Sequence, residues 1–141
     1  MINLFSTIIR LALAFVLGGV IGLEREKKGG SAGLRTHILV TVGSALVMLT
    51  SLYIYDTCQG EGIIDPGRLA AGVVTGIGFL GAGTIIRSKE GIRGLTTAAS
   101  IWVSAAIGLA VGCGYFSAAI IVTGASYLAL SLLKKLEKEV V

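Results

Sequence analysis

Five long apolar runs limit what this chain can fold into. They cover residues 4–23, 38–55, 69–86, 95–111 and 116–133. An apolar α-helix needs roughly 20 residues to cross the hydrocarbon core of a bilayer, and 54% of the 141 residues are hydrophobic while only 14% are charged. We therefore predict an all-α fold, a polytopic membrane helix bundle with about five transmembrane helices. The bundle takes residues 1–133, in contact with the lipid bilayer, and residues 134–141 form a short tail.

The same composition excludes several other classes of protein. The mean hydropathy of +0.88 is far above that of a water-soluble domain. The net charge of +4 does not indicate nucleic-acid binding, because the basic residues lie in short clusters between the apolar runs. Cys58 and Cys113 are too few and too far apart in the sequence for a metal cluster or a disulfide framework. No nucleophile, base and orienting residue recur together, so we expect neither enzymatic activity nor a bound cofactor.

Basic residues alternate between successive loops. Lys and Arg number zero before the first apolar run, then four, one, three and zero in the loops, and three in the tail. Cytoplasmic loops of membrane proteins carry the excess of Lys and Arg. The alternation therefore places the N-terminus outside and the C-terminus in the cytoplasm.

Glycine is concentrated in the third apolar run. At about 100° per residue, one helix face carries Gly72, Gly76 and Gly83, and the opposite face carries Gly78 and Gly81. Two smooth faces predict a central helix with close neighbours on both sides. The glycines serve either this packing alone or a polar path lined by their carbonyl groups. The dinucleotide-binding pattern G-x-G-x-x-G over residues 76–81 is rejected, because that pattern requires an exposed turn after a strand.

The fourth apolar run has a polar face. Thr97, Ser100, Ser104 and Gly108 recur at steps of three or four residues, and Trp102 lies on the opposite side. The hydroxyl groups either hydrogen-bond a neighbouring helix or coordinate a hydrated ion. Because the third and fourth runs are short and contain glycine, each is either an ordinary short helix or a broken, re-entrant segment.

Arg10 is the one charged residue several positions inside an apolar run. It shares a helix face with Ala14, Gly18 and Gly22. An arginine at this depth is costly unless it pairs or reaches water. Arg10 therefore either extends to the outer interface or is a functional residue held in the bundle. In the second case we expect Asp65 to be its partner.

The single histidine of the chain, His37, lies close to Arg35 at the expected inner edge of the membrane. A histidine in this place is either solvated or a proton sensor. We expect His37 to be a solvated interfacial residue.

Four motifs match one known family. They are Gly22-Leu-Glu24-Arg25-Glu26, Gly33-Leu-Arg35-Thr36-His37, Ile77-Gly78-Phe79-Leu80-Gly81-Ala82-Gly83 and Gly94-Leu-Thr96-Thr97-Ala98-Ala99. In this order, across nearly the whole chain, they resemble the MgtC/SapB family. The resemblance implies a multi-pass protein of the bacterial inner (plasma) membrane, linked to magnesium homeostasis, low-magnesium and acid stress adaptation, and virulence. Some members carry a cytoplasmic domain after the last helix, and we expect this chain to be a short form without it.

The family name suggests a magnesium transporter, and the acidic residues bear on that suggestion. Mg²⁺ sheds water reluctantly and prefers carboxylate oxygens as protein ligands. None of the eight acidic residues lies within the five apolar runs. Glu24 and Glu26 lie at the expected cytoplasmic end of the bundle, and Asp65 lies at the outer end. We therefore assign no metal ligand and expect Mg²⁺ only as a transported or sensed ion.

Two functions follow from these observations. The lack of acid inside the apolar runs favours a regulator of another membrane protein, for which the resemblance implies the ATP synthase as partner. The alternative is a small ion or solute transporter with a path lined by glycine and hydroxyl groups. The glycine faces also suit self-association as a homodimer. The candidate functional residues are Arg10, Glu24, Arg25, Glu26, Arg35, Thr36, Asp65, Arg68, Gly76, Gly78, Gly81, Gly83, Thr96, Thr97 and Ser100.

The alternation of basic loops predicts the sidedness of both ends of the bundle. In a Cys113→Ser background, an impermeant thiol reagent added to intact cells should label Cys58, because the loop after the second run lies outside. A reporter fused after Val141 should be active as a cytoplasmic protein. Labelling of Cys58 only after the membrane has been opened would contradict this topology.

Overall fold

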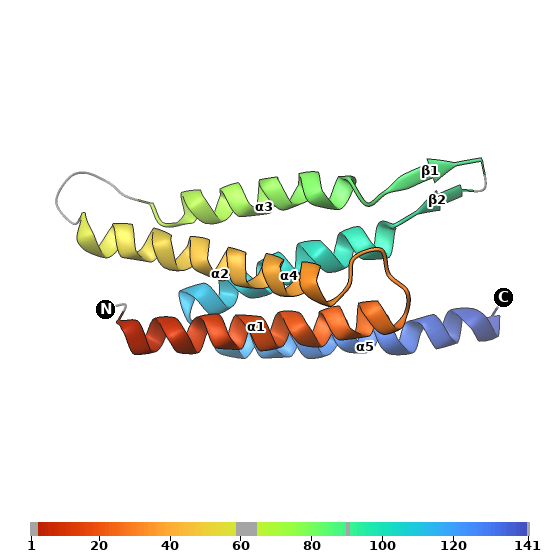
Figure 1. Cartoon of the computed structure of the whole chain (residues 1–141), viewed down its shortest axis with the longest axis horizontal. Coiled ribbons are helices and arrows are strands. Elements are labelled where there is room, and N and C mark those ends of the chain that lie inside the picture. Colours follow the sequence, from red (N-terminus) through yellow and green to blue (C-terminus); the bar gives the residue numbers. More distant parts are fainter. Residues whose placement is uncertain (1–2, 59–64, 90, 141) are drawn as a thin grey trace.

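The computed structural model describes residues 3–58, 65–89 and 91–140. Within these residues the chain forms five helices and one short β-hairpin (Figure 1). The elements are α1 (Leu4–Lys27), α2 (Leu34–Thr57), α3 (Gly67–Ala82), β1 (Ile86–Ser88), β2 (Gly91–Arg93), α4 (Leu95–Cys113) and α5 (Phe116–Val140). The prediction of an all-α membrane helix bundle is confirmed.

The helices differ in how well their lengths match a bilayer. In the described part of the chain, α1, α2 and α4 are long and apolar enough to cross a membrane. The apolar helix α3 has 16 residues and is shorter than a full span. The charged ends of α1 and α2 continue the helices beyond the predicted runs, so both helices extend past the expected edge of the apolar layer.

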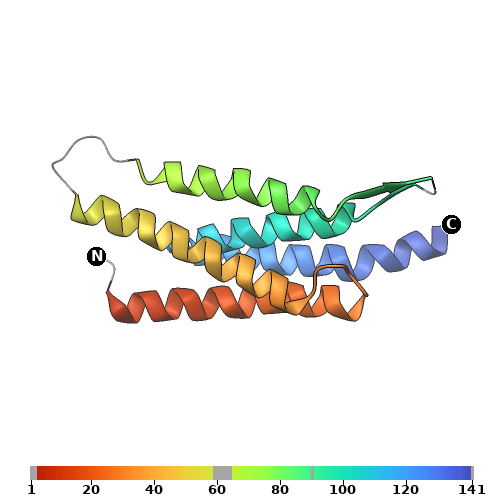
Figure 2. The same cartoon turned by 45° about the horizontal axis from the view of Figure 1, so that its top comes forward.

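The helices lie side by side along the long axis of the molecule (Figures 1 and 2). The hairpin, the loop of residues 28–33 and the C-terminus lie at one end, called here the hairpin end, and the N-terminus lies at the other (Figure 1). The two loops with the most basic residues therefore share one end of the bundle, as the alternation of charge predicts. Which side of the membrane this end faces stays a prediction.

The third apolar run is not helical to its end. We predicted a span over residues 69–86, but α3 ends at Ala82 and the chain turns into a hairpin in which Ile86 pairs with Arg93. The Thr84 hydroxyl donates to the Gly81 carbonyl at 2.8 Å and so occupies an acceptor at the end of the helix. Hydropathy alone cannot detect such a stop, since Ile85 and Ile86 are as apolar as the helix before them.

Backbone contacts at glycines hold α2 against α1 and α4. A side chain at Gly108 of α4 would collide with the Thr41 carbonyl of α2, and a Cβ at Gly112 would lie 2.6 Å from the Ala45 carbonyl. A Cβ at Gly18 of α1 would likewise lie 2.6 Å from Thr41 Oγ1 of α2. Small residues allow this approach, which gives membrane helices their close packing. The three helices α1, α2 and α4 therefore form the core.

The prediction that the glycine-rich third helix is central was wrong. The helix α3 lies at the edge of the bundle, where it packs on α4 and α2. A Cβ at Gly72, Gly76 or Gly78 would meet no atom within 4 Å, and Gly81 faces Ala98 at an ordinary 3.6 Å. Glycine periodicity shows that two faces are smooth, but it does not show which neighbour covers them.

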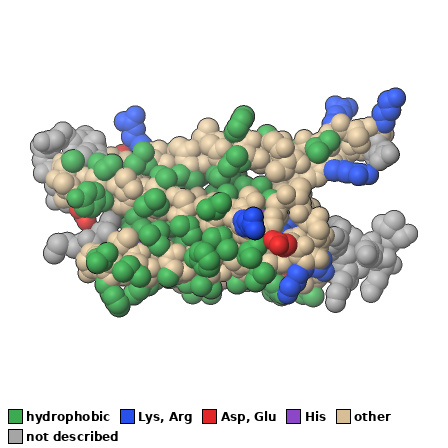
Figure 3. Space-filling model, viewed as in Figure 1, with side chains coloured by type: hydrophobic (Ala, Val, Ile, Leu, Met, Phe, Trp, Pro, Cys, Tyr) green, Lys and Arg blue, Asp and Glu red, His purple; other side chains and the backbone are tan. Residues whose placement is uncertain are grey.

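The outside of the bundle is apolar. Figure 3 shows hydrophobic side chains over the middle of one face and Lys and Arg mainly toward the ends. Phe79 is 82% exposed and Leu39 is 72% exposed. A water-soluble protein rarely exposes so much apolar surface, whereas contact with lipid chains removes the cost.

The glycine contacts predict a sharp difference between two Gly→Ala substitutions. Gly108→Ala should lower stability by about 1–3 kcal/mol, because the new methyl group forces α2 and α4 apart. Gly78→Ala is the matched control and should leave stability unchanged or slightly higher, since its methyl group meets no neighbour. Thermal unfolding in detergent micelles measures both. Equal melting temperatures for the two variants would contradict the α2–α4 contact.

Candidate functional site

Polar residues of three motifs meet at the hairpin end. The last turn of α1 supplies Glu24 and Arg25, which are only 5% and 8% exposed. The first turns of α2 and α4 supply His37 and Thr97, both buried. Buried charged groups are rare unless they are paired or functional, so this end of the bundle is the candidate site.

The Arg25 side chain reaches from α1 to α4. Its Nη2 donates a hydrogen bond to Thr97 Oγ1 at 3.2 Å, and the Ser31 hydroxyl donates to the same oxygen at 3.4 Å. Arg25 Nε is buried and has no hydrogen-bond partner. One threonine oxygen therefore joins α1, the loop of residues 28–33 and α4, while part of the guanidinium remains unsatisfied.

The two acidic neighbours of Arg25 have other partners. Glu26 Oε2 accepts a hydrogen bond from the Leu34 backbone N–H at 2.7 Å and so caps the start of α2. Gly33 makes room for this carboxylate, since a Cβ there would lie 2.6 Å from Oε2. Glu24 Oε1 lies 3.9 Å from Lys28 Nζ, an ion pair one helical turn apart. Neither carboxylate is an ion-pair partner of Arg25.

His37 is fully buried, so the expectation of a solvated histidine was wrong. Its Nδ1 lies 2.8 Å from the Gly33 carbonyl, and its Nε2 lies 3.0 Å from Ser100 Oγ on α4. Because a carbonyl can only accept, Nδ1 carries a proton. In the neutral ring Nε2 then accepts from the Ser100 hydroxyl, and in the charged ring Ser100 donates instead to the Thr97 carbonyl at 2.8 Å. The sequence analysis missed this contact because α2 and α4 are distant in the chain.

The helix α2 carries a polar face that the sequence analysis did not identify. His37, Thr41, Ser44 and Ser51 are buried and recur at helical spacing. Thr41 Oγ1 donates to the His37 carbonyl at 2.7 Å, and a Cβ at Gly108 would meet both Thr41 and Ser44. The signal was present, since small polar residues at steps of three, four and seven indicate a buried helix face.

The polar face predicted for the fourth run is buried against α2, as its spacing suggested. Thr97, Ser100 and Ser104 are each at most 5% exposed, and Trp102 points outward. The Ser104 hydroxyl is buried without a hydrogen-bond partner in the structure. The hydroxyl face of α4 therefore packs against α2. Near the start of α4, Ser100 on this face contacts His37.

Arg10 and Asp65 do not pair with each other. Arg10 Nη1 donates to the Gly112 carbonyl at 2.7 Å and so satisfies an acceptor in the last turn of α4. Asp65 Oδ1 accepts from the Gly67 backbone N–H at 2.8 Å at the start of α3. The sequence placed Arg10 on the packed face of its helix, but its partner is a backbone group 102 residues away, which no side-chain pattern reports.

The other candidate residues divide into two groups. Exposed positions are Arg35, Thr36, Arg68, Thr96, Gly76 and Gly78. Gly81 is buried against α4, and Gly83 lies at the exposed end of α3 beside the site. Of the predicted residues, the structure gathers Glu24, Arg25, Glu26, Thr97 and Ser100 at the hairpin end.

A pocket of about 600 Å³ opens at the hairpin end. The ends of α1 and α3, the loop of residues 28–33, the hairpin and the start of α4 form its walls. Among the residues that the structure describes, its charged lining residues are Arg25, Lys28 and Arg93, and no carboxylate is in the lining. In the described part of the chain, no three His, Cys, Asp or Glu side chains are grouped so that they could hold a metal ion. The pocket is therefore basic.

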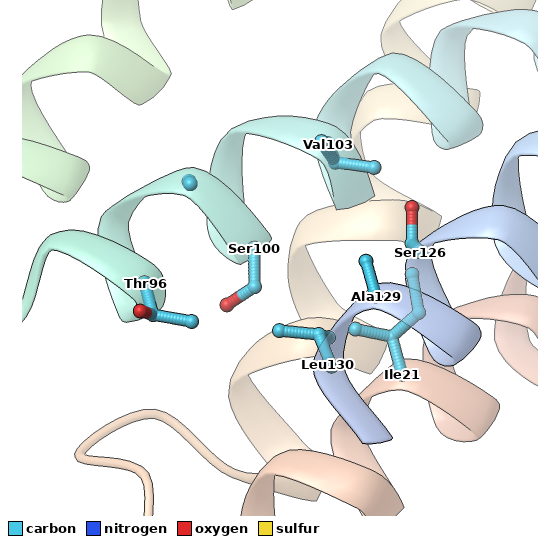
Figure 4. A pocket seen from close by; sticks show the side chains of 8 residues that line it. Ile21, Thr96, Ser100, Val103, Ser126, Ala129 and Leu130 are labelled. Carbon is cyan, nitrogen blue, oxygen red and sulfur yellow. The ribbon is translucent and has the colours of Figure 1, made fainter. Parts of the chain in front are cut away.

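A second cavity, of about 160 Å³, lies between α1, α4 and α5 (Figure 4). Ser100 and Thr96 of α4 and Ser126 of α5 line it, together with apolar side chains that include Ile21 and Leu130 (Figure 4). Its surface is almost wholly apolar. Among the described residues, the cavity brings no charged group to Ser100.

These features define a helical integral membrane protein, with an apolar exterior, polar helix faces turned toward each other and charge collected at one end. The model of the MgtC family matches residues 11–139. The chain belongs to the MgtC family.

Several curated proteins are similar in sequence to this chain. The "Putative magnesium transporter YhiD" of Escherichia coli K12 is 52% identical over 111 residues, which are 77% of this chain and 52% of that protein. "Protein MgtC" of Salmonella typhimurium LT2 is 45% identical over 120 residues, 85% of this chain and 49% of that protein. "Protein SrpB" of Synechococcus elongatus is 39% identical over 137 residues, 92% of this chain and 75% of that protein. The chain spans about half the length of the first two relatives. No solved structure was found to match the chain.

The contact between His37 and Ser100 predicts a difference between two serines of one helix face. Ser100→Ala should lower stability by about 1–3 kcal/mol, because buried His37 Nε2 loses its partner. Ser104→Ala is the matched control and should be neutral or stabilising, since its hydroxyl has no partner to lose. Thermal unfolding in micelles compares the two. A greater loss for Ser104→Ala would contradict the assigned contact.

Proposed function

We propose that this protein is a non-enzymatic regulator in the bacterial inner membrane that serves magnesium homeostasis by binding another membrane protein. Family membership and the name of the E. coli relative, a putative magnesium transporter, support the link to magnesium. A groove between α2 and α3 carries the proposal of a binding partner. The apolar lining of this groove and the short length of α3 suit a transmembrane helix as the occupant.

The groove has a volume of about 440 Å³ and an apolar lining. Gly43 of α2 and Gly76 of α3 form two smooth positions in its walls, and a Cβ at either would meet no atom within 4 Å. Val47 and Leu80 add apolar side chains to the lining. Exposed glycine beside apolar side chains is the surface on which membrane helices approach closely.

The length of α3 adds a second argument. Its 16 residues span about 24 Å at 1.5 Å per residue, which is less than the roughly 30 Å of a typical hydrocarbon core. A short helix can relieve such a mismatch by associating with another helix. A partner helix in the groove would shield the ends of α3 from lipid.

The partner that the family resemblance implies is the membrane sector of the ATP synthase, and we propose it as the partner to test. A transmembrane helix of that sector offers the apolar, rod-like surface that the groove fits. A second copy of this chain is the competing occupant. The two occupants are distinguishable, because only the second changes the mass of the purified protein by self-association.

Transport of an ion or small solute is the second candidate function. The observation that favours it is the buried row of polar groups between α2 and α4, which includes Thr41, Ser44 and Ser104. Two features count against it. The glycine contacts at Gly108 and Gly112 press α2 and α4 together along this row, and the row has no carboxylate, the ligand that Mg²⁺ prefers.

The His37 and Ser100 pair does not support catalysis. Its 3.0 Å separation is that of a base and a nucleophile. However, the partner of Nδ1 is the Gly33 carbonyl rather than a carboxylate, and both side chains are buried. Apart from the hydroxyl groups of Thr96 and Ser126, the described lining of the cavity beside Ser100 is apolar, which is a weak setting for a developing oxyanion. We therefore assign this pair to helix packing.

Filling the groove should remove the proposed function without unfolding the protein. Gly76→Leu adds a side chain where no atom of the chain lies within 4 Å of the new Cβ, so the bundle should remain intact. Co-purification of the ATP synthase membrane sector should fall at least about tenfold, which corresponds to about 1.4 kcal/mol of binding free energy. Growth that depends on this protein at low Mg²⁺ should fail.

The matched control is Gly124→Leu. Gly124 lies on α5, which packs on α1 and α4 away from the groove, and its added Cβ also meets nothing within 4 Å. This variant should keep both partner binding and growth. Mg²⁺ flux into proteoliposomes of the purified protein, above that of empty liposomes, would overturn the regulator in favour of transport. Loss of self-association in Gly76→Leu, with no change in the co-purified ATP synthase, would assign the groove to a second copy.

A further inference from the structure

We propose that the basic pocket at the hairpin end binds a phosphate group, supplied either by a phospholipid headgroup or by a soluble phosphate compound. This site is separate from the groove between α2 and α3, so the inference does not depend on the proposed regulatory partner. Three features of the pocket carry it: an unsatisfied buried guanidinium, the start of α4, and the absence of acid from the walls that the structure describes.

The first feature is the state of Arg25. This side chain is 92% buried, because its exposure is 8%, and it lines the pocket. Its Nη2 has a partner in Thr97 Oγ1, but Nε has none. Within the described residues, no carboxylate lies within 4.0 Å of it, since the ion pair recorded there joins Glu24 to Lys28. A buried cation without a counter-charge is unfavourable, and an anion in the pocket would supply that charge.

The second feature is the amino-terminal end of α4. Its N-cap residue, Gly94, has a left-handed φ of 90° and offers no side chain to accept from the first-turn N–H groups. Gly94 and Thr97 both line the pocket. The free amide groups and the helix dipole favour a negative charge at such an end. The start of α4 and the Arg25 guanidinium therefore both favour a negative charge in the same pocket.

The third feature is the charge of the remaining wall. Lys28 lines the pocket from the loop side and Arg93 from the hairpin, while Glu24 and Glu26 are held by Lys28 and the Leu34 backbone N–H and do not line it. Arg25, which has no ion-pair partner among the described residues, and the further cations of the wall disfavour a metal ion such as Mg²⁺. They suit an anion whose charge is spread over several oxygens.

The donors present favour phosphate over a single carboxylate. A guanidinium is a donor suited to phosphate oxygens, and Lys28, which also pairs with Glu24, supplies a point charge beside it. The hydroxyl groups of Ser31 and Thr97 lie beside Arg25. A volume of about 600 Å³ leaves room for more than the phosphate itself. The place of the pocket at one end of the bundle allows either a lipid headgroup or a soluble ligand to reach it.

The test compares two neighbouring lysines of the full chain. Lys28→Gln removes a pocket cation, and Lys27→Gln removes an exposed cation that does not line the pocket. The free-ligand arm titrates delipidated protein in neutral detergent with inorganic phosphate, against chloride at equal ionic strength, and follows the melting temperature. The lipid arm compares nanodiscs of phosphatidylcholine alone with nanodiscs that also contain phosphatidylglycerol.

We expect one arm to stabilise the wild-type protein. In that arm Lys28→Gln should weaken the apparent affinity about tenfold and Lys27→Gln less than about twofold, because a charge-assisted hydrogen bond is lost only in the first. Arg25→Gln should weaken it further, and if that variant fails to fold, the pair of lysine variants still decides. A response to phosphate identifies a soluble ligand, and a response to phosphatidylglycerol identifies a headgroup. Absence of response in both arms, or equal losses in Lys27→Gln and Lys28→Gln, would overturn the site.

Discussion

The close approach of α2 and α4 is the contact on which the other features of the bundle depend. Between membrane helices the lipid is as apolar as the side chains, so association relies on packing and hydrogen bonds. Gly108 and Gly112 allow the backbone of α4 to reach the carbonyl groups of α2. This approach brings His37 within 3.0 Å of Ser100 and encloses the polar faces of both helices. His37 and Ser100, whose polar groups would be costly against lipid, thus satisfy one another.

The position of charge follows from the same constraint. A charged side chain in the middle of a bilayer is expensive, and within the described residues the two buried charged side chains, Glu24 and Arg25, lie at an end of the bundle. There the last turn of α1 meets the first turn of α4 through Thr97. The basic pocket forms where these helix ends, the loop and the hairpin meet. Its electrostatic character is therefore a consequence of how the helices end.

The helix α3 connects the two surfaces that we propose to be functional. Gly76 lines the groove against α2, and Gly83, just after the last residue of α3, lines the basic pocket. The inner face of α3 contacts α4 at Gly81 through an ordinary van der Waals distance to Ala98. A helix held only on one side can contact a partner on the other. A ligand in the pocket and a helix in the groove would therefore touch the same element.

The sequence by itself determined the class of protein, most of the helix positions and the polar face of α4. The length of an apolar run and the spacing of residues on a helix face are local properties, so they can be recognised without a structure. Only the tertiary structure decided that α3 lies at the edge, that His37 is buried and that Arg10 binds the Gly112 carbonyl. These facts depend on which faces meet across long stretches of chain. A smooth or polar face can be recognised from its own residues, but its partner is chosen by the packing of the whole bundle.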